Sequence, residues 1–222
     1  MGRHSIYCLI GKSGSGKDTI YKELAGDPSL ALGHIVPCTT RPMRAEEKDG
    51  REYYFYSEEE FRKMLADGAV IEHRCYQTVH GPWYYFTADD GQIDLSARST
   101  LLIGTLESYK ALARWFGDDG VGSGYRDGVA GDGSEGDDEA GSDSEKVVKP
   151  IYVEVEDGLR LQRLLDRERA QEVPRYREMC RRFLADSEDF SEEKIAEAGI
   201  TRRFVNEDLD VCLKEIKEYI KC

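Results

Sequence analysis

The sequence predicts an α/β fold of three layers built around a mostly parallel central sheet. Two observations support this prediction. Strand-like apolar runs alternate with segments of helical periodicity along most of the 222 residues, and the first strand leads into a glycine-rich turn that opens a helix. A chain of this length can build the hydrophobic core of one large domain or of two small ones.

The first half of the chain is expected to hold short strands around two helices. The first strand is predicted over residues 5–10, and the helix after the glycine-rich turn over residues 19–25. Ser57 and Glu60 have the spacing of a capping box, which predicts the start of the second helix. The expected buried face of that helix comprises Phe61, Met64 and Leu65. Further strands are expected over residues 34–38, 52–56, 69–75 and 83–87.

In the second half, an apolar strand over residues 100–104 is followed by a helix over residues 106–116. Pro174 should separate two later helices, because proline removes a helical hydrogen bond. The remaining predicted elements are a strand over 151–155, helices over 158–171 and 175–185, and a last helix over 208–221. The expected apolar face of the last helix comprises Leu209, Leu213, Ile216 and Ile220.

The acidity of the chain is concentrated in one segment. Of the net charge of −13, residues 117–145 carry ten acidic side chains and one arginine, which leaves −4 for the rest. Residues 117–146 consist mostly of Gly, Asp, Ser and Glu, which bury too little apolar surface to offset the entropy of ordering. We expect a flexible acidic insert in a surface loop rather than a partner-docking segment. The net charge therefore does not argue against an anionic ligand.

The composition excludes several classes of protein. The six cysteines and four histidines are scattered without metal-ligand spacing, so we expect reduced thiols and no zinc site. The chain has no apolar run of membrane-spanning length and no signal-peptide pattern at its N-terminus. These features favour a cytoplasmic protein without a membrane partner.

Residues 11–17, Gly-Lys-Ser-Gly-Ser-Gly-Lys, predict a binding loop for the phosphates of ATP or GTP. The glycines allow a tight turn in which successive N–H groups converge on an anion, and Lys17 can reach the outer phosphates. A ligand-free glycine-rich hairpin is the alternative. The residues expected at the nucleotide are Gly11, Ser13, Gly14, Ser15, Gly16, Lys17, Asp18 and Thr19.

Asp18 stands where a serine or threonine normally follows the lysine of such a loop. We therefore expect Thr19 to supply the hydroxyl beside a magnesium ion. The role of Asp18, as a carboxylate on the side of the metal or of its water, stays open.

A second motif places Arg41 and Arg44 three residues apart, with Pro42 preventing a regular helix between them. Two guanidinium groups from one loop suit a single phosphate group, which each can bind through two N–H donors. In the alternative interpretation, these arginines form ion pairs with Glu46, Glu47 or Glu52.

Together, the two motifs resemble the guanylate kinase family. Its acceptor-site pattern is matched by Thr39, Thr40, Arg41, Arg44, Glu47, Gly50, Tyr53 and Phe55. Three further segments resemble the family: residues 70–72, which end in Glu72; residues 84–87, which contain Tyr85 and Thr87; and residues 206–210, which begin with Asn206. Arginines at positions similar to those of the family's lid are Arg163, Arg167 and Arg182.

The resemblance implies a P-loop NTPase fold with a small mixed α/β acceptor-binding subdomain and a helical lid. All 222 residues would form one guanylate kinase-like domain. The implied core comprises about residues 1–34, 100–116, 147–160 and 200–222, the acceptor-binding subdomain about residues 35–99, and the lid about residues 161–190.

The implied activity is transfer of the γ-phosphoryl group from ATP to GMP or dGMP, assisted by Mg²⁺. Arg41, Arg44, Tyr53 and Tyr85 would hold the acceptor phosphate, Glu72 and Thr87 the base, and Asn206 the ATP. The catalytic residues implied are Lys17, Arg41, Arg163, Arg167 and Arg182. The implied partners are nucleotides and not nucleic acids, and the sequence does not indicate an oligomeric state.

For several of these residues, a purely structural role stays open as the alternative. Tyr53 and Tyr85 could be core aromatics on strands, and the lid arginines could form surface ion pairs. Asn206 could be no more than a helix N-cap.

The base-reading positions depart from the family. Pro37 replaces a base-contacting serine, Phe86 replaces a glycine, and Ile103 and Thr105 replace two aspartates. Two other functions therefore stay open: phosphorylation of another nucleotide or a phosphorylated ribose, and phosphopeptide binding without catalysis. The intact glycine-rich loop and Lys17 argue against the second of these.

Overall fold

The computed structural model describes residues 4–44, 46–78, 81–117 and 146–221. The chain divides into two compact units. The first comprises residues 1–5, 33–100 and 111–148, and the second comprises residues 6–32, 101–110 and 149–222. The 118–145 part of the predicted acidic insert lies outside the described residues.

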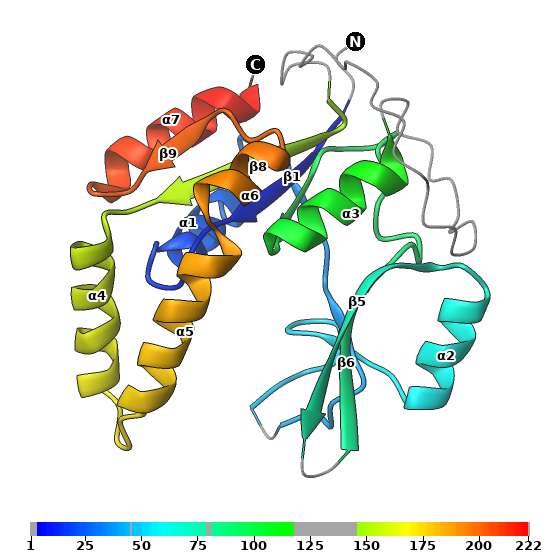
Figure 1. The fold of residues 1–222 in the computed structure, drawn as a ribbon. Helices are drawn as coiled ribbons and strands as arrows, with labels where there is room; N and C mark the ends of the chain where they lie inside the picture. The colour runs from blue at the N-terminus through cyan, green and yellow to red at the C-terminus, as the bar shows by residue number, and fades with distance from the viewer. Residues whose placement is uncertain (1–3, 45, 79–80, 118–145, 222) are drawn as a thin grey trace. The chain divides into compact units, whose positions relative to one another are not determined.

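A five-stranded sheet carries the glycine-rich segment of residues 11–17, which we call the phosphate loop. Its strands lie in the order β2–β7–β1–β8–β9. Strands β8 and β9 are neighbours and run parallel (Figure 1), with Val153 opposite Phe204. The strand bounds are β1 Ile6–Ile10, β2 Gly33–His34, β7 Thr100–Ile103, β8 Val148–Glu154 and β9 Arg203–Val205. All five residues of β1 are buried and apolar, as expected for a central strand of such a sheet.

Helices α1 (Lys17–Ala25) and α7 (Leu209–Lys221) pack on this sheet. Leu213 and Ile216 of the predicted apolar face of α7 are buried, together with Cys212 and Tyr219, while Leu209 and Ile220 are partly buried against the same core. That core also includes Leu9, Ile20, Leu24, Leu101, Ile151, Val153 and Phe204. The rigid sheet and its helices hold the loop between β1 and α1.

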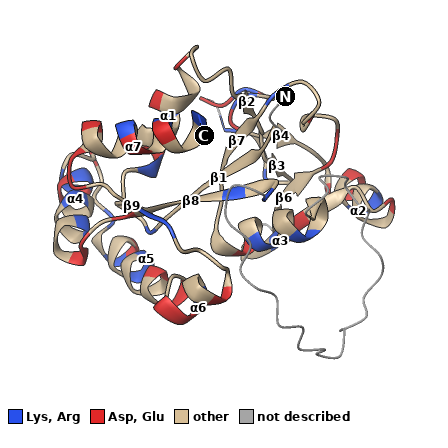
Figure 2. Ribbon diagram, turned by 90° about the horizontal axis from the view of Figure 1, so that it is seen from above, with Lys and Arg blue, Asp and Glu red and all other residues tan. Residues whose placement is uncertain are grey.

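Helices α4 (Asp157–Arg169) and α5 (Tyr176–Asp189) lie side by side and are joined by a turn that contains Pro174 (Figure 1). The short helix α6 (Glu192–Glu197) follows them. Lys, Arg, Asp and Glu alternate along α4 and α5, whereas β1 is uncharged (Figure 2). The position of Pro174 between two helices confirms the predicted division.

A four-stranded sheet has the order β4–β3–β6–β5. Its strands are β3 Cys38–Thr39, β4 Tyr54–Phe55, β5 Val70–Thr78 and β6 Gly81–Ala88. Helix α2 (Glu58–Ala66) begins at the predicted capping box and buries Phe61 against Cys38, Val70 and Phe86, with Met64 and Leu65 packed at the side. Helix α3 spans Leu106–Phe116, as predicted.

The predicted strand over residues 34–38 is wrong. These residues are split between β2 and β3, with a gap at residues 35–37. Pro37 has no N–H to donate to a neighbouring strand. The side chain of Gln92 binds both backbone groups of Val36: its Oε1 accepts the N–H at 2.9 Å, and its Nε2 donates to the carbonyl at 3.2 Å. Two elements of the structure, α6 and β9, were not predicted from the sequence.

Candidate functional site: a phosphate loop and an arginine-rich acceptor site

The phosphate loop connects β1 to α1 in a conformation that requires glycine. Gly16 is the N-cap of α1 with φ +87°, and its carbonyl accepts the N–H groups of Thr19 and Ile20, both at 3.0 Å. A Cβ atom on Gly16 would lie 2.4 Å from Nδ2 of Asn206. The loop therefore ends at the positive end of the α1 dipole, where anions bind well.

Asn206 fixes the phosphate loop from the other end of the sequence. It is buried, and its Nδ2 donates to the Ser15 carbonyl at 2.7 Å. It is not an N-cap, because Asp208 accepts the N–H groups of Asp210 and Val211 at the start of α7. Oδ1 of Asn206 and Oγ of Ser15 are buried without a hydrogen-bond partner among the described residues. The loop and the residue that supports it thus each contain a buried polar atom that no described residue satisfies.

The first turn of α1 presents Lys17, Asp18 and Thr19. Lys17 is half-buried at the first helical position, and the other two residues are exposed. Their side chains are therefore accessible to a ligand at the end of the loop.

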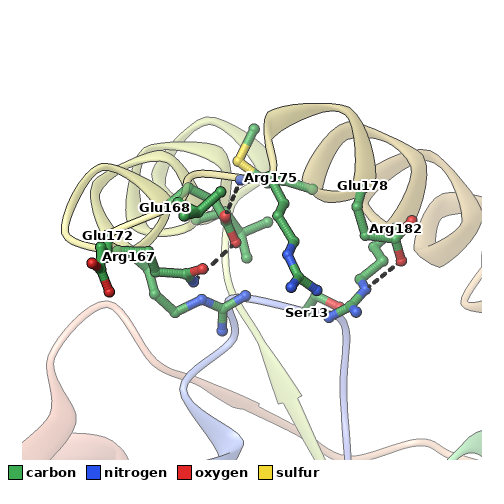
Figure 3. A pocket seen from close by; sticks show the side chains of 11 residues that line it. Ser13, Arg167, Glu168, Glu172, Arg175, Glu178 and Arg182 are labelled. Carbon is green, nitrogen blue, oxygen red and sulfur yellow. Dashed lines mark hydrogen bonds and ion pairs between the residues drawn. The ribbon is translucent and has the colours of Figure 1, made fainter.

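A pocket of about 500 Å³ opens between the phosphate loop and helices α4 and α5 (Figure 3). Arg167, Arg175 and Arg182 point into it toward Ser13 of the loop. Other lining residues include Leu164, Gln171, Val173, Met179 and the glutamates Glu168, Glu172 and Glu178. Three guanidinium groups beside a phosphate loop suit the charge of a triphosphate.

Two of the predicted lid arginines, Arg167 and Arg182, thus lie at the phosphate loop. Arg163 is not among the residues that line the pocket. The sequence analysis missed Arg175, whose position directly after Pro174, between two helices, was an available signal.

The acidic residues of the pocket already engage some of these arginines. Nε of Arg182 donates to Glu178 at 2.9 Å, so the predicted surface pair exists for this residue. Arg181 and Arg182 lower the pKa of Glu178 to about 2. Glu168 accepts the backbone N–H of Arg175 at 2.8 Å. The guanidinium of Arg175 points toward Ser13 of the loop (Figure 3).

Two threonines shape the turn that carries Arg41 in the first unit. Oγ1 of Thr39 donates to the Tyr84 carbonyl at 2.9 Å and accepts the N–H of Arg41 at 3.1 Å. Oγ1 of Thr40 accepts the N–H of Tyr84 at 2.9 Å. Because these bonds tie the turn to strand β6, the start of the Arg41 side chain is fixed.

Arg41 is buried and held by a bidentate ion pair with Glu47. Its Nη2 and Nη1 donate to the two carboxylate oxygens at 2.7 and 3.0 Å, and Nη1 also donates to the Pro42 carbonyl at 2.7 Å. These bonds from Arg41, with the N–H of Arg44, lower the pKa of Glu47 to about 2. The ion-pair alternative therefore holds for Arg41, although its charge remains in the site.

Tyr53 and Tyr85 lie next to this arginine. Nε of Arg41 donates to the Tyr85 hydroxyl at 3.2 Å, the guanidinium lies 5.6 Å from the Tyr53 ring centre, and the two tyrosine rings pack edge-to-face. Tyr85 lies on β6 opposite Thr39, while Tyr53 precedes β4. Arg44 is exposed, and its guanidinium forms no hydrogen bond or ion pair with another described residue. Arg44 is therefore the more accessible of the two cations.

The strand register brings Glu72 and Thr87 together. They are opposite each other in the β5–β6 pair, and Oγ1 of Thr87 donates to Glu72 at 3.0 Å. Arg74, two residues along the same face, lies 3.7 Å from the other oxygen of Glu72. The predicted base-binding residues thus lie on the same sheet as Tyr85.

Three of the four positions that depart from the family pattern have structural roles. The Pro37 carbonyl accepts the N–H of Tyr54 at 2.9 Å, and Phe86 is buried in the core of this unit. Thr105 caps α3 by accepting the N–H of Ser108 at 3.3 Å, whereas Ile103 is exposed. Pro37, Phe86 and Thr105 thus serve strand pairing, packing and capping, respectively.

Comparison with known proteins finds similarity to guanylate kinases. The family model for guanylate kinase matches residues 3–90, which include the phosphate loop, Arg41 and the Glu72–Thr87 pair. This segment is guanylate kinase-like. The resemblance expected from the motifs is confirmed for this part of the chain.

Curated guanylate kinases match a similar length of the chain. The guanylate kinase of Porphyromonas gingivalis is 38% identical over 82 residues, which are 37% of this chain and 42% of that protein. The guanylate kinase of Schizosaccharomyces pombe is 45% identical over 64 residues, 29% of this chain and 32% of that protein. The chain thus matches at most about two fifths of the length of these guanylate kinases.

The fold resembles that of a guanylate kinase over nearly the whole chain. The crystal structure of guanylate kinase from Anaplasma phagocytophilum matches with a TM-score of 0.56 at 20% identity, over 99% of this chain and 86% of that one. With its mostly parallel sheet and helices, the protein has the predicted P-loop α/β fold.

Proposed function

We propose that the protein is a phosphotransferase of the guanylate kinase type, which transfers the γ-phosphoryl group of ATP to GMP or dGMP to give GDP or dGDP. The observation that supports this most is the phosphate loop, which ends in a left-handed Gly16 directly before Lys17 at the start of α1. Loops of this geometry bind the phosphates of nucleoside triphosphates.

On the donor side, the loop N–H groups and Lys17 would hold the β- and γ-phosphates. Asn206 supports the loop through Ser15, so its effect on ATP binding would be indirect as well as direct. Among the described residues no cluster of three or more His, Cys, Asp and Glu side chains suits a metal ion. A magnesium ion would fit, because it needs few protein ligands beside phosphates and waters; Thr19, with Asp18 beside it, would hold it. The ion would neutralise charge on the transferring group.

On the acceptor side, Arg44 and Arg41 would bind the monophosphate, with the hydroxyls of Tyr53 and Tyr85 as further donors. Burial raises the pKa of Tyr53, so that this hydroxyl stays protonated. Glu72 would accept from the N1–H and the 2-amino group of guanine, and its bond from Thr87 orients the carboxylate. Guanine has both donors, whereas adenine has no N1–H, so Glu72 favours a guanine acceptor.

Catalysis in this proposal depends on position and charge. The acceptor phosphate is ionised near neutral pH and needs no general base, and arginines stabilise the charge that spreads over the transferring group. Arg167, Arg175 and Arg182 are the candidates for this role, because they line the pocket at Ser13. Arg163 is a weaker candidate. Residues 35–99 would serve as the acceptor-binding subdomain and residues 161–190 as the lid.

Partners and location follow from the activity. The partners would be ATP and the monophosphate, and the protein would work in purine nucleotide metabolism in the cytoplasm. Among the described helices, none is apolar over a length that would cross a bilayer.

A coupled assay of diphosphate formation tests the proposal. GMP and dGMP should be turned over with ATP and Mg²⁺, whereas AMP and ribose bisphosphate should not, and Lys17→Ala should lower kcat/KM at least about a thousandfold. A bisubstrate analogue that links adenosine and guanosine through phosphates should inhibit competitively against both substrates. Turnover of ribose bisphosphate but not of GMP would refute the proposal that GMP is the acceptor. Binding of phosphopeptides without any turnover would refute the proposal that the protein is an enzyme.

A further inference from the structure

The backbone of the phosphate loop is hydrogen-bonded at Ser13 to one side chain from α4 and one from α5. The Ser13 N–H donates to Oδ2 of Asp186 at 2.7 Å, and Nη1 of Arg160 donates to the Ser13 carbonyl at 3.2 Å. The same Nη1 donates to Oδ2 of Asp186 at 3.1 Å. The backbone N–H and the backbone carbonyl of Ser13 are therefore both bound by the Arg160–Asp186 ion pair.

The guanidinium of Arg160 is buried and held on several sides. It is completely inaccessible to solvent, it lies 4.2 Å from the centre of the Phe183 ring, and its Nε donates to Asp157 at 3.0 Å. Nζ of Lys12 lies 3.7 Å from the same oxygen of Asp157, so a second loop residue joins the network. A charge buried this deeply is retained only where its partners are well placed.

Packing also fixes the loop against α4. Gly14 has φ +82°, and a Cβ atom there would lie 3.0 Å from the Cγ and carbonyl of Arg160 and from Cγ of Leu164. The loop backbone thus lies directly on the helix, with no space for a side chain between them. A shift of α4 relative to α5 would move the loop.

We propose that Arg160 and Asp186 are positioning residues, which hold the phosphate loop in the shape that binds the donor's phosphates. Neither residue needs to touch the nucleotide. Because Asp186 takes the Ser13 N–H and the Lys12 carbonyl accepts the Ser15 N–H at 3.2 Å, the N–H groups of Gly14, Gly16 and Lys17 are the ones left for the phosphates. This inference rests on the proposed function in so far as it names ATP as the ligand of the loop.

Variants can separate positioning from simple stability. In Arg160→Met/Asp186→Leu both charges are replaced by apolar groups of similar size, which often preserves the stability lost when one partner alone is removed. We expect a melting temperature close to that of the wild type, a KM for ATP at least about tenfold higher, and kcat and the KM for GMP within about threefold. Asp186→Asn keeps an acceptor for the Ser13 N–H and should recover most of the ATP affinity lost in Asp186→Ala. Asp189→Ala, at an exposed carboxylate on the same helix, is the matched control and should behave like the wild type.

Amide hydrogen exchange of the loop provides a readout that needs no nucleotide. In the double variant, the amides of residues 13–17 should exchange at least about tenfold faster, while those of β1 stay protected. Unchanged loop exchange, or an unchanged KM for ATP in a folded double variant, would overturn the inference. If the wild type bound no ATP, the proposed function would fail, while the exchange experiment would still decide whether the pair holds the loop.

Discussion

At the scale of single residues, the two arginines proposed to bind the acceptor phosphate, Arg41 and Arg44, differ in the part they can play. Arg41 is buried, and Glu47 and Tyr85 already bind its guanidinium, so it acts chiefly as a fixed positive charge. Arg44 is exposed, and its side chain can turn to a ligand. Removal of Arg44 should therefore weaken acceptor binding, whereas removal of Arg41 would also leave Glu47 without its partner.

The Arg41–Glu47 pair predicts a pH dependence of stability. The pKa of Glu47 falls from its ordinary value of 4.5 to about 2 in the folded protein. A carboxyl whose pKa is lowered by folding stabilises the protein above its unfolded pKa, and this contribution is lost as the pH falls from about 4.5 to about 2. Glu47→Gln should be less stable than the wild type at pH 6, and the difference should shrink as the pH falls below about 4.5 and vanish only below about pH 2.

Denaturant titrations at a series of pH values measure this difference, and a carbon NMR titration of the carboxyl measures the pKa. The exposed neighbour Glu46, changed to Gln, serves as the control. A constant difference between wild type and Glu47→Gln from pH 6 to pH 2 would contradict the assignment.

A comparison of two glycines separates the cost of crowding in the phosphate loop from the cost of a left-handed backbone. Gly16 and Gly91 have φ values of +87° and +89°, but a Cβ atom would contact Asn206 at Gly16 and nothing within 4 Å at Gly91. Gly91→Ala should cost about 1–2 kcal/mol of unfolding free energy for the left-handed backbone alone. Gly16→Ala should cost more and should also raise the KM for ATP. Equal losses of stability in the two variants, measured by chemical denaturation, would show that Asn206 does not crowd the loop.

At the scale of secondary structure, short-range patterns located most elements. Helix α2 begins where Ser57 and Glu60 form both bonds of a capping box, and α3 has the bounds given by its periodicity. The errors occurred where distant groups compete for the backbone. Gln92 ends the strand expected at residues 34–38, and β9 exists because it pairs with β8, about fifty residues earlier.

The capping box makes a prediction at this scale. Oγ of Ser57 accepts the Glu60 N–H at 3.1 Å, and Glu60 accepts the Ser57 N–H at 2.7 Å. Ser57→Ala should lower the unfolding free energy by about 1 kcal/mol. Ser187→Ala, in the last turn of α5, should be neutral or slightly stabilising, because alanine favours helices more than serine and the hydroxyl only donates to the Phe183 carbonyl of the same helix at 3.3 Å. Thermal and urea denaturation of both variants measure the contrast, and an equal effect would argue against the cap.

At the scale of the whole molecule, the residues proposed to bind the donor and those proposed to bind the acceptor belong to different compact units. The phosphate loop, Asn206 and the pocket arginines lie in the second unit, and Arg41, Arg44, Glu72 and Thr87 lie in the first. The phosphate loop follows β1 of the five-stranded sheet, whereas Glu72 and Thr87 lie on β5 and β6 of the four-stranded sheet. Variants of one set should therefore change the KM for one nucleotide more than for the other.

The acidic segment leads to a prediction about the whole chain. Residues 118–145 are mostly Gly, Asp, Ser and Glu and contain no predicted site residue. Replacing these 28 residues by a linker of about seven Gly and Ser residues should leave kcat and both KM values unchanged. The shorter loop should stabilise the protein slightly, by about 0.6 kcal/mol for each halving of its length. Loss of activity in a variant that still folds would show that the segment contributes to function.

The sequence by itself determined the phosphate loop, the separate motifs of the guanylate kinase-like pattern and most helices, because each of these depends on residues a few positions apart. Only the tertiary structure decided which charges act together. Asn206 reaches Ser15 across 191 residues, and Arg160 reaches Ser13 across 147. Arginine-rich helices look alike along the chain, since 3.6-residue periodicity shows that a helix has faces but not which of its arginines will lie beside a distant loop.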